Sequence, residues 1–274
     1  MHAGKVFLIS LVLLCILTLT GCTCLTHPVI PTKVPEVYPG ILQGYLPQIQ
    51  APNSLILLPP PPAKESAAFA ADQEVFYSTR SMINTPRWSQ AIKDAEYRFP
   101  DAPKAFSCAL NAPITRDAMP NLYMLMQRTF TDAIVATLAT KNKYKRVRPF
   151  AVNKQVSCTP KDEAELVKDG SYPSGHTSFG WTWALILAEI APDRADAILS
   201  RGYAFGQSRV ICGVHWQNDV NAGRVIAAAV VAKLHSDPVF RAQLEAAKKE
   251  LDEVKAKGLK PAVDCRAEAA ALSF

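Results

Sequence analysis

Several common functional patterns are missing from this 274-residue sequence. It contains no Gly-rich loop of the Walker or dinucleotide-binding kind, and it has no dense tract of Lys and Arg. The formal net charge of +6 is a mild excess, which suits small anionic substrates and argues against a nucleic-acid partner. Only five histidines are present, and neither the cysteine spacings nor the carboxylates form the clusters that bind metals. We therefore expect no metal site, no cofactor and no nucleic-acid binding.

Long alternation of apolar and polar residues, the pattern of half-buried strands, is also missing. Apolar residues instead recur every three to four positions from about residue 67 onward, which predicts an all-α fold. We expect a single helical-bundle domain, because 274 residues with 49% hydrophobic content can bury one large core. Pro120 and Pro238 suit first helical turns, and Asp193 and Asp237 suit N-caps. The predicted helices span residues 120–140, 177–191, 194–206, 219–235 and 238–257.

Residues 1–22 have the pattern of an export signal. An uncharged apolar run of 16 residues spans 6–21, whereas a membrane-spanning helix needs roughly 20. The run ends in Leu-Thr-Gly-Cys22, which resembles the lipobox of bacterial lipoproteins, in which the cysteine is acylated. Because residue 23 is Thr and not Asp, the resemblance implies the outer membrane. We expect a periplasmic or outer-membrane-anchored lipoprotein whose membrane contact is the lipid on Cys22; an ordinary signal peptide cut nearby is the alternative.

Residues 23–66 differ in composition from the rest. Ten prolines occur between residues 27 and 62 with hardly any charge, which disfavours both helix and sheet. We interpret this segment as a tether or as an arm that lies on the domain, and the sequence leaves both open. The predicted catalytic domain follows at residues 67–257, and the tail at residues 258–274 carries no functional pattern.

Seven cysteines are present, and four of them lie in the body of the chain. Exported proteins form disulfides, so we expect two here. Three pairings are possible. We favour Cys108 with Cys158 and Cys212 with Cys265, and buried free thiols are the alternative.

The first cluster of candidate functional residues runs from Lys141 to Arg148 and Pro149. The proline restrains the backbone beside Arg148, whose guanidinium can grip two phosphate oxygens. A solvated basic end of a helix would show the same charges, because cations are favourable there for dipole reasons alone.

The second cluster is Ser174-Gly175-His176. Ser174 suits an N-cap, and the free N–H groups of a helix start form an anion site that Gly175 leaves open. His176 would then lie beside the bound anion. An ordinary helix capped by serine is the alternative.

The third cluster contains Arg209, His215 and Asp219. His215 and Asp219 are four residues apart, so on a helical turn their side chains face one another. A carboxylate on one imidazole nitrogen fixes the tautomer and raises the basicity of the other nitrogen. A structural His–Asp hydrogen bond and a pair of metal ligands are the alternatives.

Taken together, the patterns K-x6-R-P, P-S-G-H and S-R-x5-H-x3-D resemble the signature of the phosphatidic acid phosphatase type 2 superfamily. The stretches GSYPSGHTSFGW and GQSRVICGVHWQNDV are similar to the secreted class A bacterial nonspecific acid phosphatases. The resemblance covers about residues 67–257. It implies an all-helical, metal-independent homo-oligomer that hydrolyses small phosphate monoesters, with an active site related to that of vanadium haloperoxidases.

The resemblance also implies a role for each candidate residue. His215 would attack phosphorus and carry the phosphoryl group, while Asp219 orients its ring. His176 would protonate the leaving alcohol, which predicts an acidic optimum. An alcohol in place of water would give phosphotransferase activity. The groups expected to hold the phosphate oxygens are Lys141, Arg148, Arg209, Ser174 and the Gly175 amide.

Three other functions compete with this one. A vanadate-dependent haloperoxidase would use the same pocket. A serine hydrolase would use Ser174, although the G-x-S-x-G pattern is missing. A lipoprotein that only binds phosphate compounds would have no use for the paired histidines. Tyr172 and Trp216 are candidates for stacking on a base, with core or rim positions as the alternative.

Overall fold

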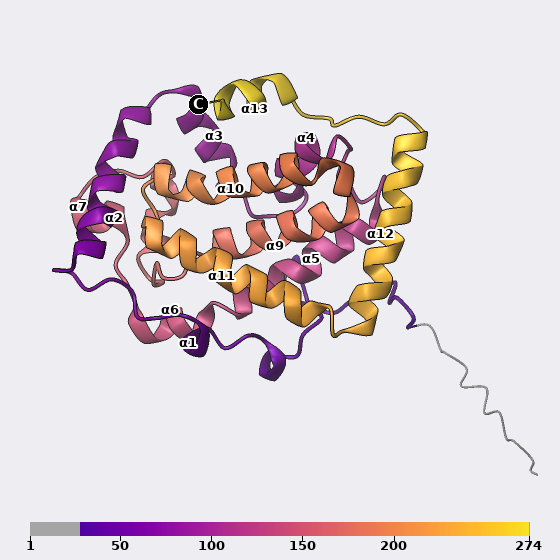
Figure 1. Cartoon of the computed structure of the whole chain (residues 1–274), viewed down its shortest axis with the longest axis horizontal. Helices are drawn as coiled ribbons and strands as arrows, with labels where there is room; N and C mark the ends of the chain where they lie inside the picture. Colours follow the sequence, from indigo (N-terminus) through magenta and orange to yellow (C-terminus); the bar gives the residue numbers. More distant parts are fainter. Residues whose placement is uncertain (1–27, 274) are drawn as a thin grey trace, which may run out of the picture.

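The computed structural model of the chain describes residues 28–273 (Figure 1). The predicted export signal at residues 1–22 and the predicted lipid attachment at Cys22 lie outside the described residues. Within residues 28–273, none of the helices combines the length and the apolar character that crossing a membrane requires.

The chain is all-α, as the sequence predicts. The longer helices are α2 (Ala67–Ser78), α3 (Pro86–Lys93), α5 (Pro120–Val135), α6 (Leu138–Tyr144), α9 (Gly175–Ile190), α10 (Ala195–Ile211), α11 (Gln217–Leu234), α12 (Pro238–Ala256) and α13 (Cys265–Leu272). The shorter ones are α1 (Ser54–Leu57), α4 (Ser107–Leu110), α7 (Pro149–Asn153) and α8 (Glu163–Leu166). The 3-10 helices are η1 (Gln48–Gln50), η2 (Thr79–Met82), η3 (Ala102–Phe106), η4 (Pro160–Asp162) and η5 (Pro192–Arg194). Two short strands, β1 (Glu36–Tyr38) and β2 (Ile41–Leu42), pair antiparallel.

Helix α9 lies at the centre of the bundle, between α10 and α11 and against α5 (Figure 1). It is apolar around its circumference, which is typical of a helix surrounded by others, and Phe179, Trp183 and Leu187 are buried. The Trp183 indole N–H donates to the carbonyl oxygen of Met126 at 3.0 Å and ties α9 to α5. The core of the molecule is therefore built around the helix that begins at Gly175.

The start of α9 is held against the first turns of α11. The Ser174 amide donates to the carbonyl oxygen of Asp219 at 2.9 Å. A side chain at residue 223 would not fit, because a Cβ on Gly223 would lie 2.7 Å from the Ser174 carbonyl oxygen. This close approach brings the segments of His176 and His215 together, although they are far apart in the sequence.

Several helix boundaries match the sequence predictions and others do not. Asp237 caps α12 by accepting from the Phe240 amide at 2.8 Å, as predicted. Asp193 is not an N-cap, which makes that prediction wrong: it lies inside η5 and pairs with Lys255 at 3.1 Å. Helix α10 continues past the predicted end at residue 206, because its last turn is anchored by the Ser208 hydroxyl, which donates to Asp94 at 2.6 Å.

The predicted helix over residues 120–140 is interrupted after Val135. At the break, the Thr137 amide bonds to Ile134, three residues back, and the Thr137 hydroxyl donates to the same carbonyl oxygen at 2.7 Å. The ladder of α-helical bonds is thus interrupted, and α6 starts afresh at Leu138. Lys141 is therefore carried on α6 rather than on the long helix α5.

Two disulfides form, but the favoured pairing was wrong. Cys108 bonds to Cys265, and Cys158 bonds to Cys212. Cys158 lies beside the end of α10, where its amide donates to the Cys212 carbonyl oxygen at 2.9 Å. The tail carries α13 back over α3, which places Cys265 next to Cys108 on α4. Distances along the chain could not indicate this, because helix packing decides which cysteines meet.

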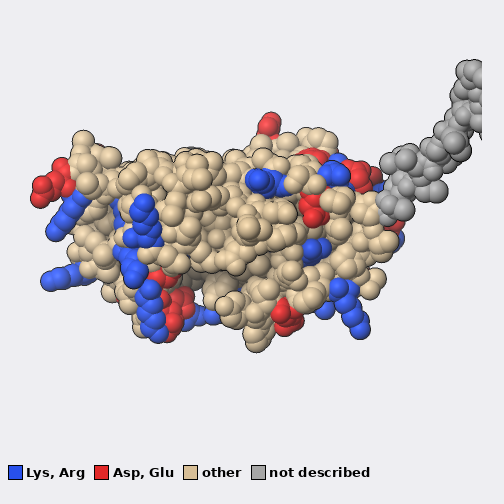
Figure 2. All heavy atoms as spheres, turned by 90° about the horizontal axis from the view of Figure 1, so that it is seen from below, with Lys and Arg blue, Asp and Glu red and all other residues tan. Residues whose placement is uncertain are grey.

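The Pro-rich segment lies against the domain over much of its described length. The Asp132 carboxylate accepts the amides of Tyr45 and Leu46, each at 3.0 Å, and the Tyr45 hydroxyl donates to Gln243 at 2.6 Å. Burial raises the pKa of Asp132 to about 6, while the two amides oppose that rise. Figure 2 shows the face on which α1 and α6 lie; charged side chains gather towards its two ends and are sparse in between.

Candidate active site

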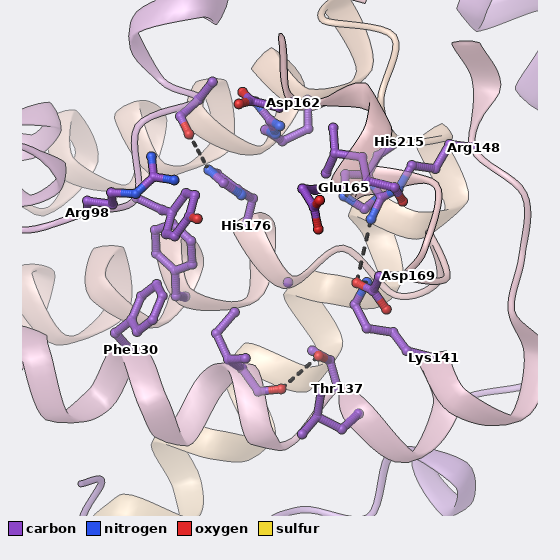
Figure 3. A pocket seen from close by; sticks show the side chains of 18 residues that line it. Arg98, Phe130, Thr137, Lys141, Arg148, Asp162, Glu165, Asp169, His176 and His215 are labelled. Carbon is purple, nitrogen blue, oxygen red and sulfur yellow. Dashed lines mark hydrogen bonds and ion pairs between the residues drawn. The ribbon is translucent and has the colours of Figure 1, made fainter. Parts of the chain in front are cut away.

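A cavity of about 440 Å³ opens at the N-terminal end of α9 (Figure 3). Six of the eight predicted catalytic and phosphate-binding residues line it: Lys141, Arg148, Gly175, His176, Arg209 and His215. They come from α6, α9, the end of α10 and the loops before α7 and α11. Asp219 lies behind His215. Ser174 is fully buried and caps α9 as predicted, because its hydroxyl oxygen accepts the Thr177 amide at 3.2 Å.

His215 is 4% exposed and is held in one orientation from both sides of its ring. Nδ1 lies 3.4 Å from Oδ2 of Asp219, and Nε2 lies 3.1 Å from Nη1 of Arg148. A carboxylate can only accept and a guanidinium can only donate, so the proton belongs on Nδ1 and the lone pair on Nε2. Burial lowers the pKa of His215 well below its usual value, and the charges of Arg148, Lys141 and Arg209 add to the effect. The ring is thus a neutral imidazole whose unprotonated nitrogen, Nε2, accepts from Arg148.

His176 faces the same cavity in the neutral form with the opposite tautomer. Its Nε2 donates to the carbonyl oxygen of Ala95 at 3.0 Å, which leaves the lone pair on Nδ1. The ring packs among aromatic side chains, with centroids 4.9 Å from Phe179 and 5.8 Å from Tyr97. Burial lowers the pKa of His176 well below its usual value, and Arg209 adds to the effect. An anion bound in the cavity would oppose this shift and favour the protonated ring.

Three buried cations surround the inner end of the cavity. Lys141 donates to Asp169 at 2.8 Å and to the carbonyl oxygen of Gly170, and Arg148 donates to the Leu166 carbonyl oxygen at 2.7 Å. Burial lowers the pKa of each, and for Arg209 it does so to about 10.

Arg209 has unused donors in this cluster. Its Nε and Nη1 are buried, and neither has a hydrogen-bond partner among the described residues. Unpaired buried donors are costly, so a site of this kind is completed by an anion that accepts from them. The inner end of the cavity therefore has the charge and the free donors that a phosphate group requires.

The mouth of the cavity has a different character. One wall is apolar and includes Tyr97, Phe130, Ile134 and Leu138. The rings of Tyr97 and Phe130 stack with centroids 6.5 Å apart, and Arg98 lies over the Tyr97 ring at 4.6 Å. The other wall carries the carboxylates of Asp162, Glu165 and Asp169 (Figure 3). The mouth thus lies between an aromatic surface and an acidic one.

The two aromatic residues predicted as candidates for stacking on a base do not line this cavity. Tyr172 is 3% exposed and donates its hydroxyl to the Pro59 carbonyl oxygen. Trp216 is 1% exposed and donates to the Val147 carbonyl oxygen. Both are core residues. The mouth is lined instead by Tyr97, which no sequence pattern distinguished.

Sequence reasoning also missed the residues behind Asp219. Arg146 donates to Oδ1 of Asp219 at 2.6 Å and to Asp72 at 2.7 Å. Arg146 lies within the basic cluster identified from the sequence, but nothing in its spacing separated it from the surface lysines beside it. Asp72 lies on α2, far from every motif, and only the fold brings it to the site.

Comparison with known proteins places the chain in a family. The sequence profile of the PAP2 superfamily matches residues 121–241. A non-specific acid phosphatase of Providencia stuartii is 47% identical over 225 residues, which cover 82% of this chain and 88% of that relative. An acid phosphatase of Zymomonas mobilis is 41% identical over 203 residues, or 74% of this chain and 77% of the relative. A non-specific acid phosphatase of Salmonella typhimurium is 40% identical over 202 residues, or 73% and 81%.

The helical fold and a cavity with two histidines and three cations define a member of the PAP2 superfamily. Within it, the chain belongs to the bacterial non-specific acid phosphatases of class A.

Proposed function

We propose that this acid phosphatase hydrolyses phosphate monoesters of broad specificity through a phosphohistidine formed on His215. The observation that carries the proposal is the orientation of His215, whose unprotonated Nε2 lies beside Arg148 at a cavity that Lys141, Arg148 and Arg209 also line. Asp219 lies on the opposite nitrogen, where it stabilises the positive charge that forms on the ring during attack.

In the first step, Nε2 of His215 attacks phosphorus and the bond from phosphorus to the ester oxygen breaks. The protonated Nδ1 of His176 gives its proton to the departing oxygen, so the alcohol leaves neutral. The ring of His215 keeps its proton on Nδ1 and carries the phosphoryl group on Nε2.

In the second step, water attacks the phosphorus of the intermediate. Nδ1 of His176, now unprotonated, takes a proton from the water, and the bond from phosphorus to Nε2 breaks. Inorganic phosphate leaves, and both histidines return to their starting forms. An alcohol that enters in place of water gives a new phosphate ester, which is the proposed phosphotransferase activity.

The charges of Lys141, Arg148 and Arg209 support this chemistry. Phosphoryl transfer is accelerated mainly by positioning and by electrostatic stabilisation of the oxygens on phosphorus. The free donors of Arg209 and the amide at Gly175 are available for those oxygens, and the N-terminal end of α9 favours an anion.

The lowered pKa of His176 supports an acidic optimum. The free enzyme holds this ring neutral at neutral pH, so a falling pH supplies the proton that the first step consumes. His215 must meanwhile stay neutral to attack, and its pKa is also lowered. The pH profile should therefore be bell-shaped, with limbs that belong to the coupled site rather than to single residues.

Export and lipid attachment at Cys22 are part of the same proposal, together with assembly into a homo-oligomer. Two disulfides support an oxidising compartment. Incorporation of labelled palmitate into the mature protein tests the lipid, with Cys22→Ala as the control that should lose the label. Analytical ultracentrifugation tests the oligomer.

The deciding experiment traps the enzyme during turnover of a ³²P-labelled phosphate ester. We expect an acid-labile, base-stable adduct that is lost in His215→Ala. His235→Ala is the matched control, because His235 lies at the far end of α11 and pairs with Glu189. An adduct that survives in His215→Ala, or that maps to Ser174, would contradict the proposal.

A further inference from the structure

A chain of buried charges continues behind the His215–Asp219 pair. Oδ2 of Asp219 faces His215 and accepts the Trp216 amide at 2.9 Å, while Oδ1 accepts from Arg146 at 2.6 Å. The second terminal nitrogen of Arg146 donates to Asp72 at 2.7 Å. The side chains of Asp72 and Asp219 are fully buried, and that of Arg146 is 7% exposed. The Arg146 guanidinium thus donates hydrogen bonds to two buried carboxylates.

Contacts on several sides hold Arg146 in this bridging position. Its guanidinium carbon lies 5.3 Å from the centroid of the buried Trp216 ring. Asp72 is itself fixed, because Oδ1 accepts both the amide and the side-chain nitrogen of Asn218, each at 3.0 Å. Asn218 lies in the first turn of α11, next to Asp219. Helix α2, which precedes the region matched by the superfamily profile, is thereby joined to the active site.

The charge of Arg146 favours the ionised state of Asp219. Burial raises the pKa of Asp219, and Arg146 is the largest of the influences that lower it again. A protonated Asp219 would no longer stabilise the charge on His215 during attack. An enzyme that works at acidic pH has the greatest need of such a counter-charge, because there the carboxylate takes up a proton most readily.

We propose that Arg146 is a positioning residue, fixed by Asp72, that keeps Asp219 ionised and aimed at Nδ1 of His215. It acts through Asp219 and has no contact with the cavity, whose cationic lining is Arg98, Lys141, Arg148 and Arg209. This inference rests on the proposed function of His215 as the nucleophile.

The test compares Arg146→Met, Arg146→Lys and Asp72→Ala in the full-length protein, with phenyl phosphate as substrate. Arg146→Met should lower kcat between about 10- and 100-fold, the size of effect expected from a residue that orients another, with little change in KM. Arg146→Lys keeps the charge and should recover part of the loss. Asp72→Ala should lower kcat by less than Arg146→Met, because the charge remains but its position is released.

The pH profile separates this role from a merely structural one. Removing a buried positive charge raises the proton affinity of the His215–Asp219 pair, whichever member takes the proton. The acid limb of kcat/KM should therefore move to higher pH in Arg146→Met and less in Arg146→Lys. Lys143→Met, which removes an exposed cation from α6, is the matched control and should leave the profile unmoved.

Inhibition by inorganic phosphate completes the test. A nearly unchanged inhibition constant in Arg146→Met shows an intact fold and an intact phosphate site, as the proposal requires. A large rise in both KM and the inhibition constant would overturn it, because Arg146 would then bind phosphate itself. If Arg146→Met does not fold, the acid limb of Arg146→Lys decides. If the acid limb does not move in the Arg146 variants while His215→Ala is inactive, this inference alone is overturned. If His215→Ala still turns over substrate, the proposed function is overturned.

Discussion

The inner end of the cavity and its mouth differ in burial and in the elements that build them. At the inner end, Lys141, Arg148 and Arg209 are 6%, 3% and 3% exposed, and each is held on or beside a helix of the bundle. At the mouth, Tyr97 is 37% exposed and belongs to the loop after α3. In the proposed mechanism the inner end holds the phosphoryl group, whereas the mouth places few constraints on the leaving group. This difference suits an enzyme of broad specificity.

The acidic wall of the mouth adds to the contrast. Asp169 reaches across to Lys141, so in the free enzyme a carboxylate partly neutralises the inner cations. Its side chain is half-exposed and lies on the segment that leads into the Ser174 turn. A phosphate bound at the inner end would be a second anion, besides Asp169, beside these cations. There it could also accept from the unpaired donors of Arg209.

Substitution of His176 should have the largest effect among the tests of this difference between inner end and mouth. In the proposed mechanism His176 lies where the inner end meets the leaving group. His176→Ala should lower kcat about 10²- to 10⁴-fold for alkyl phosphates, because the alkoxide then leaves without a proton. The loss should shrink for p-nitrophenyl phosphate, whose leaving group needs no proton. Rates for esters with graded leaving-group pKa values would measure this, and an equal loss along the series would contradict the acid role.

Arg209→Met should have the next largest effect. Loss of one preorganised donor at the transferred phosphoryl group lowers kcat about 10²- to 10³-fold. Inhibition by inorganic phosphate should weaken in the same variant, since the missing donors serve the phosphate whatever the leaving group. Arg241→Met on the exposed face of α12 is the control. A loss that depended on the leaving group would mean that Arg209 belongs to the mouth.

Inorganic phosphate should stabilise the protein by itself, because it can bind at the inner end of the cavity without any contact at the mouth. At a phosphate concentration of 100 times Kd the gain in free energy of unfolding is about 2.7 kcal/mol. Phenol has an aromatic ring that can contact the mouth but no charge for the inner end. The same concentration of phenol should therefore shift Tm little. Differential scanning calorimetry of both additions would measure the contrast, and an equal shift would remove it.

The stability change should also depend on pH. His176 and His215 have pKa values below the unfolded value of about 6.5, so the unfolded chain takes up protons first as the pH falls. Their contribution to stability is thus present above pH 6.5 and is lost on acidification towards the folded pKa values. Phosphate should restore part of the loss, because its charge favours the protonated His176.

Tyr97→Ser should have the smallest effect, and the effect should be limited to binding at the mouth. The exposed stack of Tyr97 on Phe130 offers an aromatic leaving group a contact of about 0.5–1.5 kcal/mol. We expect a rise in KM for phenyl phosphate and no change for glycerol phosphate. Tyr38→Ser, at an exposed position on β1, is the control. A loss of kcat with both substrates would show that Tyr97 acts through His176 instead.

Much of this site could be predicted from the sequence because its parts are short and local. The N-cap at Ser174 needs only a hydroxyl three residues before an amide, and the His215–Asp219 pair spans only four residues across the start of α11. The order of three motifs then indicated which histidines and cations would meet. Helix positions followed from apolar periodicity for the same reason, since each turn repeats locally.

Other features depended on contacts between distant segments. The pairing of Cys158 with Cys212 and the burial of Trp216 each depend on a neighbour that periodicity does not reveal. Asp72 is the clearest case, because a carboxylate on α2 has no local sign that it will meet Arg146. Such residues become visible only when helices pack.

The sequence by itself thus determined the helical class, the caps at Ser174 and Asp237 and the residues at the inner end of the cavity, since these rest on local hydrogen bonds and on motif order. The tertiary structure alone decided the disulfide pairing, the docking of the Pro-rich arm, the lining of the mouth and the Arg146 bridge. These rest on burial. Charges and rings that lie far apart along the chain lose their contact with water when the helices pack, so buried polar groups need partners within the protein.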